Sequence, residues 1–306
     1  MATFIARRFL QAIVILWGVS VIVFVLLRLA PSDPITIMLA ETASPEQIAA
    51  ARHQMGFDRP IYVQYVVFVD NALHGDLGES IFYQEPALQV IFNALPNTLL
   101  LGAFAFVFSV AVGVPVGILS ALHRDTFWDY FGVGLALIGQ ATPPYWLGIM
   151  LIMLFSVGLH LLPSSGNFGP QYIILPAISL GAVLMPIVTR LVRSGMLDVL
   201  NEDYVRTARA KGLREQVVVW KHALRNMLIP LVTVLGLQVS ALFGGAVIIE
   251  QVFGWPGVGQ LAVNAIFSRD YPVVQADVLV VSSAFVFLNL LVDILYARLD
   301  PRIRYQ

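Results

Sequence analysis

Long apolar stretches separated by shorter polar segments run along almost the whole chain. Six of these stretches are long enough to cross about 30 Å of hydrocarbon as α-helices, at residues 9–30, 97–122, 131–159, 172–190, 227–249 and 273–297. The longest polar interruptions follow the first and the fourth of them. This pattern predicts an all-α integral membrane protein with six transmembrane helices.

The overall composition agrees with a membrane protein. Apolar residues make up 58% of the chain and charged residues 12%, with a mean hydropathy of +0.80, whereas charged residues are roughly a quarter of a soluble domain. The net charge is −1, so only the distribution of charge is informative. The chain has no cysteine, which excludes disulfides, thiolate metal sites and a cysteine nucleophile.

The N-terminus can be interpreted in two ways. Arg7 and Arg8 precede an apolar run, as in a secretory signal peptide. That run, residues 9–27, is longer than a typical signal core of about 7–15 residues, and no small-x-small cleavage site follows it. We therefore expect residues 1–30 to be the N-terminus and an uncleaved first transmembrane helix.

Lysine and arginine gather in alternate polar segments, which predicts the orientation because short cytoplasmic loops are enriched in positive charge. Three of the 18 lysine and arginine residues lie in segments on the side opposite the cytoplasm, at residues 52, 59 and 269, and Arg28 lies near the outer end of the first helix. All the others fall on one side, at residues 7, 8, 124, 298, 302 and 304 and at eight positions from Arg190 to Arg225. Both termini are therefore predicted to be cytoplasmic.

The outer segment at residues 31–96 is polar and acidic, and we expect it to form a small helical periplasmic domain. Ser44 followed by Gln47 is typical of a capping box at the start of a helix that Gly56 ends. A second helix is predicted within residues 58–78. We expect its aromatic face to pack on the membrane surface or on a neighbouring loop; that face consists of Tyr62, Tyr65 and Phe68.

Several predicted helices contain glycine or proline. Gly113 and Gly117 have the GxxxG spacing of closely packed helices, whereas the adjacent Pro143 and Pro144 predict a deliberate break. Broken helices also line substrate pathways in transporters. The candidate residues for a translocation path are Pro143, Pro144, Gln238 and Glu250.

Ionisable residues are almost absent from the middle of the six stretches, which disfavours transport driven by an internal ion site. Arg28, Glu250, Asp277 and Asp293 all lie toward helix ends, and none forms a convincing pair in the sequence. The histidines are scattered without HExxH spacing, and no GxSxG or GxxxxGK[ST] pattern occurs. We therefore expect no catalytic residue, metal ligand or cofactor in this chain, and an intramembrane hydrolase is disfavoured.

The basic segment at residues 201–230 contrasts with its apolar surroundings. Asn201 is expected to cap a short helix over residues 202–211, and Gly212 to end it. A second, amphipathic helix should follow and lead into the fifth transmembrane helix at Pro230. Its apolar face is predicted to contain Val217, Trp220 and Leu224, and its basic face Arg214, Lys221 and Arg225. A hairpin that touches anionic lipid is the alternative interpretation.

This segment resembles a known family. EDYVRTARAKG followed by KHALRNMLIP looks like the cytoplasmic loop of ABC-transporter permeases for dipeptides, oligopeptides, glutathione and nickel, specifically the first of their two permease subunits. The resemblance covers essentially the whole chain through ARRF, LAPSDP, HGDLGES, FGWPGVGQL, RDYPVVQA and LVDILYARLDPRIRY. It implies a type I ABC importer permease fold in a bacterial inner membrane, with residues 97–306 as the core permease domain.

The resemblance implies a coupling loop at residues 191–226 that docks on a cytoplasmic ATPase. The contact residues carried over are Tyr204, Arg206, Thr207, Ala208, Lys211, Gly212 and Arg214. This chain departs from the general importer pattern at Arg206 and Thr207, where Glu and Ala would stand, and in having more residues between Gly212 and Pro230.

A gate loop at residues 250–272 is implied at the outer mouth, where the binding protein would be met. Its candidate residues are Phe253, Trp255, Pro256, Gly257, Gly259, Asp270 and Tyr271. From spacing alone, an ordinary loop with one surface helix at residues 257–267 explains this segment equally well.

The implied partners are a second homologous permease, two ATPase subunits or domains that hold ATP and Mg, an extracytoplasmic substrate-binding protein and the lipid bilayer, with no nucleic acid. The expected function is import of short peptides driven by ATP hydrolysis in the partner chains, so this chain is not itself an enzyme. Glutathione or nickel import is an alternative within the class. A non-conducting membrane scaffold or receptor subunit is the alternative from another class.

Overall fold

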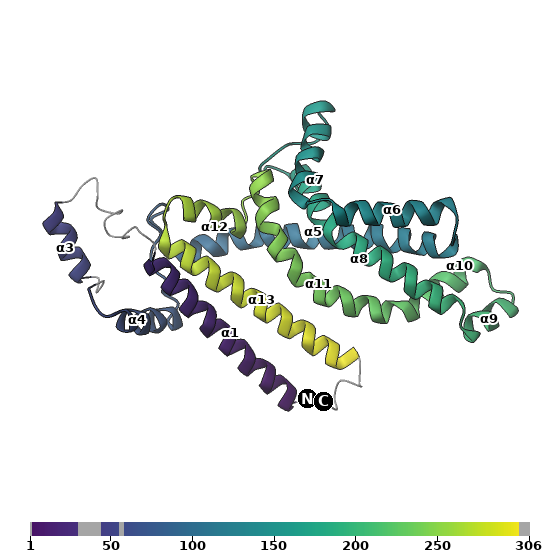
Figure 1. The fold of residues 1–306 in the computed structure, drawn as a ribbon, viewed down its shortest axis with the longest axis horizontal. Helices are drawn as coiled ribbons and strands as arrows, with labels where there is room; N and C mark the ends of the chain where they lie inside the picture. Colours follow the sequence, from purple (N-terminus) through teal and green to yellow (C-terminus); the bar gives the residue numbers. More distant parts are fainter. Residues whose placement is uncertain (1, 30–43, 55–57, 300–306) are drawn as a thin grey trace. The chain divides into compact units, whose positions relative to one another are not determined.

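The computed structural model describes residues 2–29, 44–54 and 58–299, and this part of the chain is helical (Figure 1). Gly56 and all of the LAPSDP segment except Leu29 lie outside the described residues. The elements are α1 (Ala2–Leu29), α3 (Pro45–Gln54), α4 (Ile61–Leu73), α5 (Ala87–Leu122), α6 (Phe127–Ala141), α7 (Pro144–Leu151), η1 (Ile152–Gly158), η2 (Pro170–Ile173), α8 (Ile174–Leu200), α9 (Asp203–Ala210), α10 (Glu215–Val217), η3 (Val218–Ala223), α11 (Leu224–Phe253), α12 (Val258–Phe267) and α13 (Tyr271–Leu299).

Among the described residues, four helices are long and apolar enough to cross a membrane by themselves, and the number rises to seven if each of three bent helix pairs counts as one span. The six predicted spans fall within this range. Two helices extend ten residues beyond the predicted spans. α5 starts at Ala87, ten residues before the expected start, and α8 continues to Leu200, so the first residues of the predicted coupling loop are helical.

The third predicted span, residues 131–159, is not one continuous helix. α6 ends at Ala141, and the helix that resumes at Pro144 is bent from it by 105°. Thr142 and Pro143 are both extended, with ψ values of 121° and 134°. Proline lacks an N–H and disfavours helical backbone in the residue before it, so the adjacent prolines explain the break. The break predicted at this position is confirmed.

Residues 1–96 and 257–290 form one compact unit. At the start of α3, the Ser44 N–H donates to Gln47 Oε1 at 2.8 Å and the Gln47 N–H donates to Ser44 Oγ at 3.4 Å. This reciprocal pair confirms the capping box. The aromatic face of α4 packs on α1 through Tyr65 and Phe68, whose ring centroids lie 5.3 Å and 5.5 Å from that of Phe24, whereas Tyr62 is exposed.

Residues 97–256 and 291–306 form the second compact unit. Its centre is α8, which contacts α6, α7 and α11 and lies between α6 and α11 (Figure 1). The GxxxG glycines of α5 face α8: a Cβ on Gly117 would lie 2.7 Å from the Thr189 carbonyl oxygen, and one on Gly113 would lie 2.8 Å from Val188 Cγ1. The predicted close packing at this spacing is confirmed.

Candidate functional site

The basic segment contains a short helix that is held against the end of α8 and against η3. α9 begins after Glu202, whose backbone is extended. Val205 and Ala208 on α9 are buried in a small apolar cluster with Val218, and Val199 and Leu200 of α8 pack against this cluster. The prediction that Asn201 caps α9 is wrong, because its side-chain amide donates to the Leu197 carbonyl at 2.9 Å and closes α8 instead.

The opposite face of α9 is exposed. Tyr204 is 39% exposed, and the Arg206 side chain is 70% exposed even though it pairs with Asp203 at 3.3 Å. Thr207 Oγ1 donates to the Asp203 carbonyl at 2.9 Å. The predicted contact residues on this surface are Tyr204, Arg206, Thr207, Lys211, Gly212 and Arg214. Ala208, which belongs to the same predicted set, is buried and anchors the helix.

Gly212 ends the short helix in the left-handed region, with a φ of +75°. A Cβ there would meet nothing within 4 Å, so backbone conformation alone favours glycine. Across this turn, Arg209 donates two hydrogen bonds to Glu215, at 3.2 Å and 2.8 Å. These bonds lower the pKa of the Glu215 carboxyl below its usual value.

The helical run after Gly212 differs from the predicted amphipathic helix. Residues 218–223 form wider π-type turns, and α11 then continues through Pro230. The buried positions are Val218, Val219, Ala223 and Leu224, whereas Trp220 is 55% exposed. The predicted apolar face is therefore wrong at Val217 and Trp220, because wider turns rotate the face relative to an α-helical pattern.

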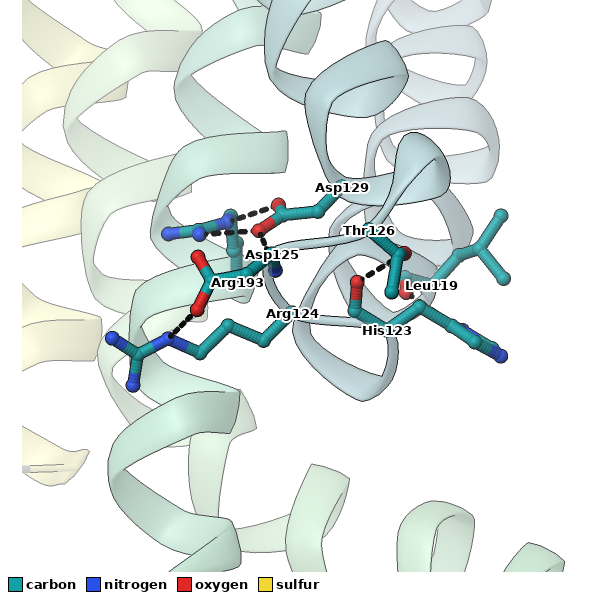
Figure 2. A network of polar contacts seen from close by, with 7 residues as sticks. All are labelled: Leu119, His123, Arg124, Asp125, Thr126, Asp129 and Arg193. Carbon is teal, nitrogen blue, oxygen red and sulfur yellow. Dashed lines mark hydrogen bonds and ion pairs between the residues drawn. The ribbon is translucent and has the colours of Figure 1, made fainter.

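The structure also contains an ion pair that was not predicted. It joins α6 to α8, the helix that precedes the basic segment. Arg193 of α8 donates from Nε to Asp129 Oδ1 at 2.6 Å and from Nη2 to Asp129 Oδ2 at 2.7 Å (Figure 2). The Asp129 side chain is 3% exposed and that of Arg193 is 27% exposed. Both residues lie just outside the predicted spans at residues 131–159 and 172–190, so the sequence pattern did not mark either as a buried charge that requires a partner.

The turn between α5 and α6 supports the aspartate. The Asp125 N–H donates to Asp129 Oδ2 at 3.1 Å, and the Arg124 side chain pairs with that of Asp125 at 3.3 Å on the surface (Figure 2). Thr126 precedes α6, and its hydroxyl donates to the His123 carbonyl. Asp129 therefore accepts three hydrogen bonds in the first turn of α6, where the helix dipole also favours a negative charge.

At the other end of α11, the predicted gate residues Phe253 and Trp255 are both 1% exposed and belong to the core of the second unit. Trp255 Nε1 donates to the Asn97 carbonyl at 3.0 Å, and the Asn97 amide donates to the Pro256 carbonyl at 2.8 Å. Gly254 ends α11 with a φ of +55°. These contacts tie the end of α11 to α5.

The other predicted gate residues lie in the first unit. Gly257 is the residue before α12, and the surface helix expected over residues 257–267 is present as α12. Asp270 is 1% exposed and accepts hydrogen bonds from Ser80 Oγ at 2.5 Å and from the Phe82 N–H at 3.2 Å. Tyr271 is half-buried and Gly259 is buried. Asp270 thus holds the HGDLGES segment against the start of α13.

The predicted path residues occupy different environments. Pro143 is exposed and Pro144 half-buried at the break, and Gln238 is half-buried on α11. Glu250 is fully buried and accepts a hydrogen bond from Thr98 Oγ1 at 2.6 Å, so its carboxylate does not face an open path in this structure. Within the described residues, no group of three or more His, Cys, Asp or Glu could hold a metal ion.

Comparison with known proteins gives full-length relatives. The di/tripeptide transport system permease protein DppB of Pseudomonas aeruginosa (strain UCBPP-PA14) is 42% identical over 335 residues, and both chains are covered completely. The glutathione transport system permease protein GsiC of Salmonella typhimurium (strain LT2) is 42% identical over 306 residues, again with complete coverage of both. The dipeptide transport system permease protein DppB of Escherichia coli (strain K12) is 40% identical over 338 residues, with complete coverage.

Solved structures support the fold. A chain of the MetNI methionine ABC transporter matches with a TM-score of 0.57 and 19% identity, covering 69% of this chain and 97% of that one. A chain of an amino acid ABC transporter matches with a TM-score of 0.53 and 13% identity, covering 69% and 94%. Identities this low support an argument about the fold alone.

Two family models together cover nearly the whole sequence. The model described as "Binding-protein-dependent transport system inner membrane component" matches residues 113–305, and the model for the N-terminal part of such membrane components matches residues 1–102. The chain therefore belongs to the family of inner membrane components of binding-protein-dependent transport systems, as a membrane-spanning permease of the ABC transporter type.

Proposed function

We propose that this chain is one of two permease subunits of an importer for short peptides, driven by ATP hydrolysis in partner chains. The observation that carries the proposal is the full-length identity of 40–42% to permeases named for di/tripeptide and dipeptide transport. An equally similar relative is named for glutathione transport. Glutathione is itself a short peptide derivative, and it is the second candidate substrate.

The exposed face of α9 supports a docking role. Val205 and Ala208 fasten the helix to the end of α8 and to Val218 of η3, and this leaves Tyr204, Arg206 and Thr207 on the outside. Aromatic and arginine side chains on a fixed element are typical interaction hot spots. We propose that this face contacts the ATPase, which would hold the ATP and Mg, and that an extracytoplasmic binding protein delivers the substrate to the opposite side.

The proposal is tested by uptake into proteoliposomes that contain this chain, its second permease and both ATPase subunits. With binding protein loaded with a dipeptide, a tripeptide or glutathione, we expect ATP-dependent accumulation of at least one of them. Liposomes without ATP are the control. A complex that assembles and hydrolyses ATP but accumulates none of these compounds would contradict the proposal. A complex that neither hydrolyses ATP nor conducts would favour the scaffold alternative.

The proposed orientation places both termini and α9 in the cytoplasm. Because the chain has no cysteine, single cysteines report sidedness directly. Glu85 and Glu202 are exposed and lie on opposite sides in this topology. In intact cells, an impermeant thiol reagent should label Glu85→Cys and should reach Glu202→Cys only after permeabilisation. Labelling of both variants from the same side would overturn the orientation.

A further inference from the structure

The ion pair between Asp129 and Arg193 joins two helices that are otherwise held by apolar contacts. The hydrophobic effect that drives such contacts is not directional. A bidentate arginine–carboxylate pair fixes both the distance and the orientation of its two groups. Figure 2 shows the guanidinium of Arg193 facing both carboxylate oxygens of Asp129. The pair therefore sets the register of α6 against α8.

Close backbone approaches along α6 preserve that register. One turn after Asp129, a Cβ on Gly132 would collide with the Ser120 hydroxyl of α5. Farther along α6, a Cβ on Gly139 would lie 3.1 Å from Pro186 Cγ of α8. α6 therefore lies close to α5 at Gly132 and close to α8 at Gly139, and the ion pair joins α6 to α8 at the end of α6 that is nearer to α9.

The same end of α8 carries the basic helix. Arg193 lies seven residues before the last residue of α8, which is about 10 Å along the helix axis. Val199 and Leu200, in the last turn of α8, pack against the cluster that anchors α9. A force applied to α9 therefore reaches the last turns of α8, where Arg193 connects them to α6.

We propose that Asp129 and Arg193 are positioning residues for coupling, because they make the start of α6 and the end of α8 move as one body when α9 is displaced. This inference rests on the proposed function, since it takes α9 as the element on which the ATPase acts. Neither side chain touches substrate or nucleotide in this scheme. They determine how much of the displacement of α9 reaches the helices that follow the break at Pro143 and Pro144.

The first test compares variants of the pair in the reconstituted importer. Asp129→Asn or Arg193→Gln alone leaves the partner's charge without its counter-charge, buried in the case of Asp129, and is expected to reduce folded protein. The double variant Asp129→Asn/Arg193→Gln removes both charges and should therefore recover much of the thermal stability. If the pair transmits motion, the double variant still imports about 2- to 30-fold fewer substrate molecules per ATP than the natural chain.

The matched control is Asp125→Asn, which alters the surface pair with Arg124 on the same turn. It should leave import per ATP unchanged. A double variant with natural import per ATP would show that the pair is only structural, and an equal loss in Asp125→Asn would show that the effect is not specific to the pair. Either result overturns the proposal.

A second test does not depend on transport. Spin labels on cysteines at the exposed positions Tyr130 and Ser194 report the distance between α6 and α8 in the assembled complex. We expect one narrow distance distribution that does not change on addition of ATP, and a broadened one in the Asp129→Asn/Arg193→Gln background. A distance that changes with ATP in the natural chain would contradict the inference, even where uptake itself confirms the proposed function.

Discussion

Replacing Trp255 by alanine is expected to lower the free energy of unfolding by about 3–5 kcal/mol, the usual range for removing a large aromatic side chain from a core. The side chain is 1% exposed, packs in the core of the second unit and donates a hydrogen bond to the Asn97 carbonyl. Thermal unfolding of the purified permease in detergent, followed by fluorescence or circular dichroism, measures this loss.

Two further variants separate the contributions of burial and hydrogen bonding. Trp255→Phe keeps most of the apolar volume and loses the indole N–H, so its expected cost is about 1–3 kcal/mol. Trp146→Ala is a matched control, because this tryptophan of α7 is 49% exposed. It should cost much less than Trp255→Ala.

The experiment also separates two interpretations of the FGWPGVGQL segment. If Trp255 served only as a contact for a binding protein, Trp255→Ala would leave thermal stability unchanged and would reduce only the stimulation of ATP hydrolysis by loaded binding protein. The burial of Phe253 and Trp255 instead favours a structural role, in which they hold the end of α11. The exposed Pro256 and the residues of α12 that reach the surface remain better candidates for such a contact.

Features of this protein that depend on neighbouring residues could be predicted from the sequence. The capping box needs only Ser44 and Gln47, and the break needs only Pro143 and Pro144. The GxxxG pair also identified a close packing surface, because a spacing of four residues places both glycines on one face of α5. In each case the physical cause lies within one or two helical turns.

The missed features depend on residues far apart or on a local change of helical period. Asp129 and Arg193 are 64 positions apart, and each taken alone resembles an ordinary charge near a helix end. The π-type turns at residues 218–223 rotate the buried face, so an α-helical period gives the wrong side for Trp220. Likewise, the FGWPGVGQL pattern identifies a segment but does not show which of its side chains enter the core.

Removing the exposed side chains of α9 is expected to have the largest effect on coupling. Tyr204 and Arg206 lie on a helix fixed by the buried Val205 and Ala208, so truncation to alanine leaves the helix in place and removes only its outer surface. Each is expected to weaken docking of the ATPase by about 1–4 kcal/mol, or roughly 5- to 1,000-fold in the dissociation constant.

The measurement is a titration of the permease complex with ATPase, followed by substrate-stimulated ATP hydrolysis at saturating ATPase. Arg225→Ala is a matched control, because Arg225 is also exposed but lies beyond the π-type turns in α11. Natural affinity in both Tyr204→Ala and Arg206→Ala would remove α9 as the docking element. An equal loss of affinity in Arg225→Ala would favour a general attraction between the basic surface of the permease and an acidic surface of the ATPase. This alternative also predicts that added salt abolishes the difference in affinity between the variants and the natural chain.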